Sequence, residues 1–105
     1  NNTMRGWLTT DADARERANL NAYFGFDITE GNVAAHLCRR TLQSVARLVM
    51  LPVQDVLGLG AEARMNTPGR ATGNWLWQLR PGQLTDDVAG QLRLWNEQTG
   101  RVSVR

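Results

Sequence analysis

The feature that most constrains the fold of this chain is a short apolar run, residues 48–53, followed by a long glycine-rich segment. An apolar run without polar alternation predicts a strand that is covered on both faces, as in a parallel sheet. Pro52 fits such a strand only near its end, because proline cannot donate a backbone hydrogen bond. Residues 54–83 contain five glycines and read as one long loop, and loops of this length are uncommon without a function. The sequence therefore predicts one buried strand that leads into a functional loop.

Three helices are predicted around this strand. The first starts within residues 10–13, which offer capping and acidic side chains, and Gly25 is its predicted end. The second starts after Asn32 and carries apolar residues at helical spacing, namely Ala34, Leu37, Cys38, Leu42 and Val45. The third starts at Thr85 and ends at Gly100. Its apolar face consists of Leu84, Val88, Leu92 and Trp95.

A single parallel strand has no partner within this pattern of elements. Its backbone N–H and C=O groups need hydrogen-bond partners, so neighbouring strands are missing from the sequence in hand. A (β/α)8 barrel supplies a buried strand, a site-building loop at its C-terminal end and a covering helix. The sequence thus predicts an α/β fold that is mostly helical, with one buried parallel strand at about residues 48–53. An unpaired strand edge also predicts self-association of the segment on its own.

The composition limits the classes of function. A chain of 105 residues allows one small domain at most. All twelve basic residues are arginine, but they are scattered among ten acids, which argues against a nucleic-acid partner. No apolar run approaches the ~20 residues that span a bilayer, so we expect no membrane contact. Cys38 is the only cysteine, which excludes an intrachain disulfide and fits a cytoplasmic protein.

Four polar residues after the predicted strand are candidates for a binding site. Asn66 has an amide that can both donate to and accept from hydroxyl groups, although an Asn before Thr-Pro-Gly is also typical of a turn. Gln54 and Asp55 lie where barrel strands usually present functional residues, and a purely structural role is equally open. Arg64 is the fourth candidate, and the rigid guanidinium favours a structural role in holding Asp55 or Glu62.

The aromatic and metal-binding residue types give weaker signals. We expect Trp75 and Trp77 to pack rather than to bind a ligand, because a tryptophan is most often a large core residue. Trp7 and Trp95 are expected in the core for the same reason. His36 and Cys38 are two residues apart, which places them on different faces of a helix, and they are not expected to form a metal pair.

Two blocks of sequence carry a more specific signal. The first block is Asn1-Asn2-Thr3-Met4-Arg5-Gly6-Trp7. The second runs through residues 44–77 and includes Ala63-Arg64-Met65-Asn66-Thr67-Pro68-Gly69 and Gly73-Asn74-Trp75. Both blocks closely resemble the amylomaltase family of 4-α-glucanotransferases. The resemblance implies that residues 1–105 are one segment, the C-terminal part of a catalytic (β/α)8 barrel rather than a complete domain.

The resemblance also implies a function. The family transfers α-1,4-glucan segments to a sugar 4-hydroxyl by retaining double displacement, without a cofactor or metal. Its three catalytic carboxylates lie upstream of this chain, and the stabilising aspartate should immediately precede Asn1. No catalytic residue is therefore expected here, and the segment alone should be inactive.

The expected partners are α-1,4-glucan or a maltooligosaccharide and the rest of the barrel. The resemblance places Asn66 beside the donor sugar subsites. The alternative is a non-catalytic carbohydrate-binding module that derives from the barrel and keeps the loop.

Overall fold

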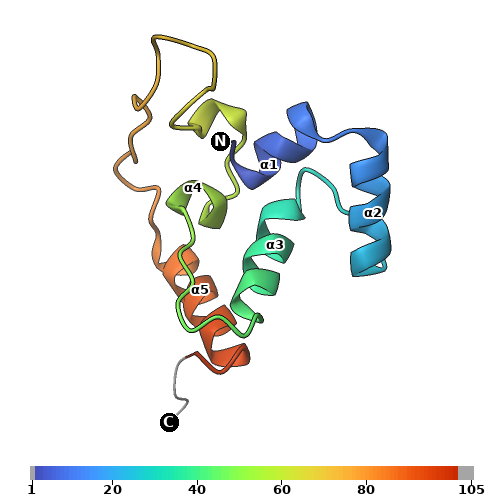
Figure 1. Ribbon diagram of the computed structural model, residues 1–105. Helices are drawn as coiled ribbons and strands as arrows, with labels where there is room; N and C mark the ends of the chain where they lie inside the picture. The colour runs from blue at the N-terminus through green and yellow to red at the C-terminus, as the bar shows by residue number, and fades with distance from the viewer. Residues whose placement is uncertain (1, 102–105) are drawn as a thin grey trace.

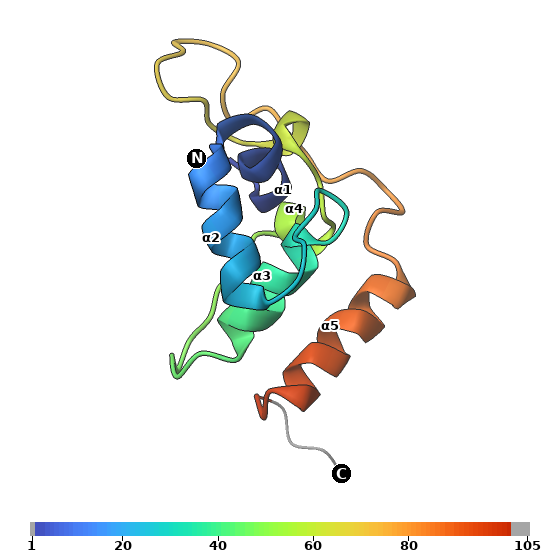
Figure 2. The same cartoon turned by 90° about the vertical axis from the view of Figure 1, so that its right-hand side faces the viewer.

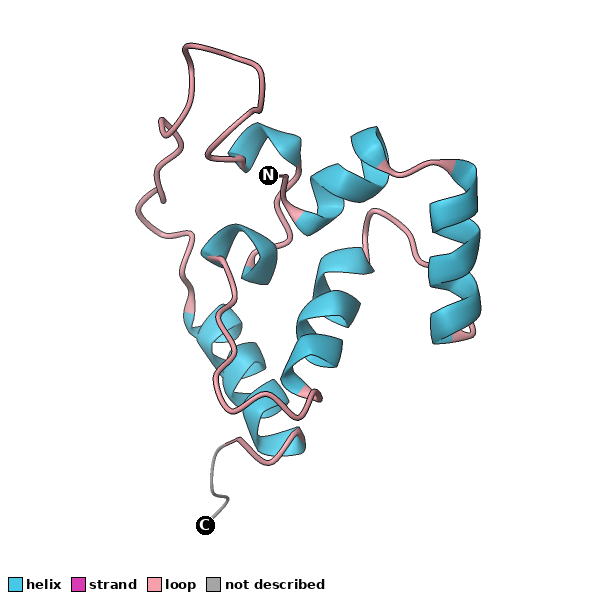
Figure 3. Cartoon of the chain, viewed as in Figure 1, coloured by secondary structure: helices cyan, strands magenta, loops and turns pink. Residues whose placement is uncertain are grey.

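A computed structural model describes residues 2–101 of the chain, and the regular elements in that range are all helical (Figures 1 and 3). The elements are α1 (Met4–Gly6), a π-helical turn η1 (Trp7–Asp11), α2 (Ala14–Phe24), α3 (Val33–Leu42), α4 (Val53–Val56), a 3₁₀ turn η2 (Ala61–Ala63) and α5 (Asp86–Gln98). Between η2 and α5 the chain follows an irregular path that projects from the helices in Figure 1. None of the described helices is long and apolar enough to cross a membrane.

The predicted strand is not found within residues 2–101, which corrects one expectation from the sequence. Residues 48–52 belong to no helix or strand, and Val53 already begins α4. Val49 and Leu51 are half-buried against the core, whereas Leu48 and Met50 are 78% and 84% exposed. A strand needs a neighbour for its backbone groups, and the described part of the chain provides none. The segment consequently has one covered face and one bare apolar face.

The first long helix, α2, has its cap within the predicted residues 10–13 and ends at Gly25, as predicted. Asp13 caps α2, because its Oδ1 accepts from the Glu16 N–H at 2.8 Å while the Glu16 side chain accepts from the Asp13 N–H at 3.2 Å. This reciprocal pair satisfies two N–H groups that a helix start leaves unpaired. Gly25 ends the helix with φ of 80°, a left-handed conformation that glycine adopts without steric cost.

The second helix, α3, is central to the core. Its buried residues Val33, Ala34, Cys38 and Leu42 follow the predicted apolar stripe. Val45, which was predicted to continue that stripe, lies beyond the end of the helix and is fully exposed. The helix therefore buries two clusters, one at each end. Leu8, Ile28 and Val33 form the first cluster, with Trp7 half-buried against it, and Cys38, Leu42 and Trp95 form the second.

The last helix, α5, begins and ends as predicted. The Thr85 hydroxyl accepts from the Val88 N–H at 3.2 Å, and Gly100 follows the helix with φ of 74°. Trp95 is the buried residue of α5 and packs against Cys38 and Leu42, whereas Leu84 is exposed.

A guanidinium fixes the chain after α5 to the end of α3. Figures 1 and 2 show the two helices approaching each other at their C-terminal ends. There Arg101 donates from Nε to the Leu42 carbonyl at 2.7 Å. Its Nη2 donates to the carbonyls of Ser44 and Ala46 at 3.2 and 2.9 Å. Carbonyls at a helix end lack partners within the helix, so this side chain closes the end of α3.

Candidate functional site

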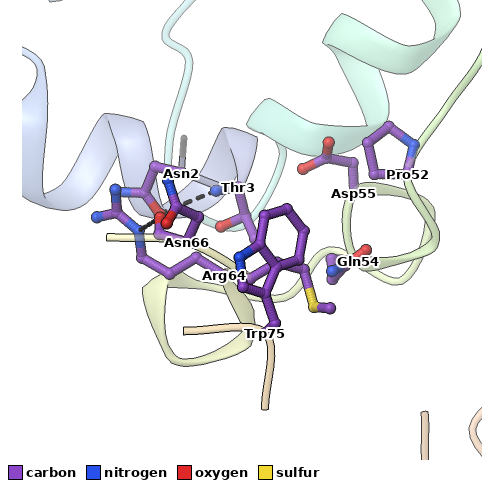
Figure 4. A pocket seen from close by; sticks show the side chains of 9 residues that line it. Asn2, Thr3, Pro52, Gln54, Asp55, Arg64, Asn66 and Trp75 are labelled. Atoms are coloured by element: carbon purple, nitrogen blue, oxygen red, sulfur yellow. Dashed lines mark hydrogen bonds between the residues drawn. The ribbon is translucent and has the colours of Figure 1, made fainter. Parts of the chain in front are cut away.

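One pocket of about 200 Å³ brings together segments that are far apart in the sequence (Figure 4). Its lining residues are Asn2, Thr3, Pro52, Gln54, Asp55, Arg64, Met65, Asn66 and Trp75. They come from the start of the chain, from α4 and from the irregular segment after η2. All four of the residues singled out from the sequence, Gln54, Asp55, Arg64 and Asn66, line this pocket.

Asp55 joins two walls of the pocket. Its carboxylate Oδ1 accepts a hydrogen bond from the backbone N–H of Met4 at 2.7 Å, and the residue is only 7% exposed. Burial raises the pKa of the Asp55 carboxyl, and the bond from Met4 opposes that shift without cancelling it. The ion pairs found among residues 2–101 are Arg5–Glu30 and Arg93–Glu97, so Asp55 does not pair with Arg64.

Gln54 and Arg64 hold the loop that forms another wall. The Gln54 side chain donates from Nε2 to the Ala63 carbonyl at 3.3 Å, which ties α4 to η2. Arg64 donates from Nε to the Asn66 carbonyl at 3.1 Å, so part of its guanidinium shapes the turn that carries the Asn66 amide. The structural role favoured for Arg64 is therefore present, with Asn66 as its partner instead of a carboxylate.

Asn2 and Thr3 line the pocket but were not singled out as site residues from the sequence. The Asn2 amide donates to Thr10 Oγ1 and to Asp11 Oδ2, both at 3.1 Å, and its Oδ1 accepts from the Thr3 N–H at 2.9 Å. The buried Thr3 hydroxyl caps α1 by accepting from the Gly6 N–H at 3.0 Å. The signal that could have identified them is the first block of family resemblance, which contains both residues.

Gly6 permits the close approach of α1 and η2 behind the pocket. A Cβ atom at Gly6 would lie 2.8 Å from the Ala61 nitrogen and 2.9 Å from the Ala61 Cα. It would also lie 2.2 Å from Asn2 Oδ1. The backbone atoms of Ala61 cannot move aside as a flexible side chain could, so any larger residue separates the two elements.

Trp75 has an unusual backbone conformation and an exposed side chain. Its φ of 62° is the only positive value at a non-glycine residue among residues 2–101, and its side chain is 70% exposed. A left-handed conformation costs an L-residue roughly 1–2 kcal/mol. The Trp75 N–H donates to the Met65 carbonyl, which closes the loop between them. Packing was expected for Trp75 and Trp77, but Trp75 is exposed and Trp77 is half-buried.

A second pair of contacts holds the same loop closed. The Asn74 side chain accepts from the Thr67 N–H at 2.8 Å and donates to the Arg70 carbonyl at 2.9 Å. These bonds cross the loop just before Trp75. The conformation of Trp75 is therefore fixed by neighbours on both sides of the loop, and its indole forms part of the pocket.

The described residues contain no group of three or more His, Cys, Asp or Glu side chains that could hold a metal ion. His36 packs against Phe24 and Phe26, with ring centroids 5.8 and 4.8 Å away. Cys38 is buried, and burial, followed by the charge of Asp55, raises the pKa of its thiol to about 11.

Comparison with known proteins gives a consistent result. A family model described as 4-alpha-glucanotransferase matches residues 1–85. The 4-alpha-glucanotransferase of Thermus thermophilus is 45% identical over 97% of this chain, and that of a Synechocystis strain is 41% identical over 96%. The chloroplastic/amyloplastic enzyme of Solanum tuberosum is 36% identical over 89%. The matches cover 21%, 20% and 16% of these relatives, so the chain spans about a fifth of their length.

A solved structure shows the same arrangement of the chain. The amylomaltase of Streptococcus agalactiae, solved in complex with acarbose, superimposes with a TM-score of 0.85 and 23% sequence identity. The match covers 98% of this chain and 20% of that protein. At this identity the likeness establishes the fold of the segment.

Proposed function

This chain belongs to the 4-alpha-glucanotransferase family, and from that premise we propose that it is the C-terminal segment of a barrel enzyme that acts on α-1,4-glucans. The observation that carries the proposal is the pocket, because both blocks of family resemblance contribute walls to it. In the complete protein, a glucan segment is transferred to the 4-hydroxyl of another sugar. The S. agalactiae relative was solved in complex with acarbose, which supports a sugar as the ligand class.

The proposed mechanism is retaining double displacement. A carboxylate attacks the anomeric carbon of the donor while a carboxylic acid protonates the leaving 4-oxygen, which gives a glycosyl-enzyme ester. The same acid, now a base, then removes the proton from an acceptor 4-hydroxyl, whose oxygen displaces the carboxylate. These carboxylates belong to upstream parts of the protein, so the segment by itself is proposed to be inactive.

We propose Asn66, Gln54, Asp55 and Arg64 as the residues through which this segment serves the substrate. Asn66 is the principal contact, because an amide can donate to one sugar hydroxyl and accept from another. Gln54 lines the pocket with a second amide. Asp55 and Arg64 also line it, and their hydrogen bonds to Met4 and to the Asn66 carbonyl keep its walls in position.

The barrel setting is proposed from the bare face of residues 48–51. In the complete protein, neighbouring strands would pair with this segment and cover Leu48 and Met50. Support comes from the alternation of covered and exposed side chains, which is the spacing of a strand. Without those neighbours, the same edge favours association with another copy. The lone cysteine supports the cytoplasm as the proposed compartment, although the potato relative is named as a plastid protein.

The test is to incubate the complete protein with maltotriose. Transfer of a maltosyl unit from one maltotriose to another yields glucose and maltopentaose in equal amounts. Hydrolysis yields glucose and maltose without maltopentaose. Absence of glucose release would contradict the proposal. If maltooligosaccharides nevertheless raised the melting temperature of the protein, the carbohydrate-binding module would be favoured instead.

A further inference from the structure

The indole of Trp75 occupies a position in the pocket that no packing requirement explains. The residue is mostly exposed, and yet it lines the same pocket as Asn66 and Gln54. In Figure 4 the indole lies between the side formed by Asn2 and Asn66 and the side formed by Gln54 and Asp55. Its ring is thus placed where a ligand in the pocket would meet it.

We propose that Trp75 is the aromatic platform of this pocket, on which the apolar face of one glucose ring of the glucan stacks. The inference rests on the proposed function and deepens it by assigning a specificity-determining residue. A pyranose ring presents C–H groups on its face and hydroxyls around its edge. An indole face suits the first, and the amides of Asn66 and Gln54 suit the second.

The backbone at Trp75 gives independent support. Gly69 and Gly73 adopt φ values of 83° and 81° in the same loop, so glycine is the residue that this loop uses for left-handed positions. Trp75 adopts φ of 62° with a bulky side chain instead. A strained residue persists where surrounding contacts enforce it, and such residues cluster at binding sites. Since the side chain gains little from burial, a ligand contact accounts for a tryptophan at this position.

The bonds around Trp75 make the platform rigid before a ligand arrives. The Trp75 N–H is held by the Met65 carbonyl, and the preceding Asn74 bridges Thr67 and Arg70. Met65 itself lines the pocket. A loop whose backbone is already fixed beside the pocket loses little conformational freedom on binding, which favours affinity.

The test compares five variants of the complete protein, with acarbose as the probe. Calorimetric titration gives the Kd, and thermal unfolding without ligand gives the melting temperature. Trp75→Ala and Trp75→Gly should raise the Kd about tenfold, the size of one aromatic stacking contact, and Trp75→Phe should stay within about threefold of the unmodified protein. Trp77→Ala is the matched control, because Trp77 is in the same segment but does not line the pocket.

Trp75→Gly separates a binding role from a packing role. Glycine adopts the left-handed conformation without strain. The melting temperature of Trp75→Gly should therefore be unchanged or higher, even though this variant binds acarbose more weakly. Unchanged acarbose affinity in both Trp75→Ala and Trp75→Gly would overturn the inference. A melting temperature lowered by several degrees in both, with no rescue of affinity by Trp75→Phe, would overturn it as well, because packing would then explain the effect.

Asn66→Ala distinguishes failure of this inference from failure of the proposed function. If Asn66→Ala weakens acarbose binding while the Trp75 variants do not, the pocket binds sugar and only the platform is wrong. If neither substitution affects acarbose binding, both the sugar site and the platform are wrong.

Discussion

The carboxylate of Asp55 and the backbone N–H of Met4 form a 2.7 Å hydrogen bond across a separation of 51 residues. The bond fixes the start of the chain to α4, and both segments contribute walls to the pocket. Because the acceptor is buried, loss of this bond leaves a backbone donor without a partner.

We expect Asp55→Ala to destabilise the protein by about 1–3 kcal/mol, the cost of leaving a buried donor unsatisfied. Asp55→Asn is the matched control, because its side-chain oxygen can still accept from Met4. It should cost less than Asp55→Ala in denaturant unfolding of the complete protein. Equal losses for the two variants would show that the hydrogen bond is not what the carboxylate contributes.

The raised pKa of Asp55 predicts a pH dependence of stability. A carboxyl whose pKa is higher in the folded state binds a proton more tightly there. Its contribution to folding stability is therefore most favourable at pH values below the unfolded pKa of 3.8. That contribution falls as pH rises through the raised folded pKa. The stability of the unmodified protein relative to Asp55→Asn should therefore decrease between pH 4 and neutral pH. A constant difference across this range would contradict the assignment.

Cys38 is expected to be unreactive in the folded protein. The thiolate is the reactive form, and burial together with a pKa raised to about 11 keeps the thiol protonated at pH 8. An aromatic disulfide reagent at pH 8 should label Cys38 only as fast as the protein opens, and denaturant should make labelling rapid. Fast labelling of the native protein would mean that the cluster of Cys38, Leu42 and Trp95 is open to solvent.

Gly6→Ala should separate α1 from η2, because the added Cβ would meet the backbone of Ala61 at 2.8 Å. We expect a loss of about 1–3 kcal/mol in the free energy of unfolding, typical of overpacking, together with weaker binding of the proposed sugar ligand. Gly90→Ala is the control, since nothing lies within 4 Å of a Cβ added at that position in α5. It should stabilise the protein by about 0.5–1 kcal/mol, because alanine is the better helix former. A Gly6→Ala variant as stable as the unmodified protein would refute the close approach.

The elements that the sequence predicted well are those set by local chemistry. Asp13 and Gly25 bound α2, and Thr85 begins α5, because a cap acts on backbone groups only a few residues away. The strand predicted at residues 48–53 would need hydrogen-bond partners from neighbouring strands, which no local pattern supplies. The run looked suited to burial on both faces, whereas Leu48 and Met50 are exposed and Val49 and Leu51 are half-buried.

The candidate site could be predicted in part, because most of its residues lie close together in the sequence. Gln54, Asp55, Arg64 and Asn66 follow one another after the apolar run, so their gathering in one pocket could be expected from their order. The place of Thr3 in the pocket depends on the contact between Met4 and Asp55, which residue spacing does not reveal, and only the first block of family resemblance pointed to it. The positive φ of Trp75 is equally hidden, because tryptophan is an unlikely choice for that conformation.

Exposed and half-buried side chains alternate along residues 48–51. The number of residues in this segment therefore matters more for the position of the pocket than the identity of each residue. Deleting Met50, or inserting one residue beside it, would change which side chains of residues 49–51 are covered, since successive side chains of an extended segment point in opposite directions. The same shift would carry Asp55 away from Met4 and so disassemble the pocket. The number of residues in this segment therefore sets the position of Asp55 relative to the core. Conservative replacements along the segment should be tolerated, whereas changes in residue number should not.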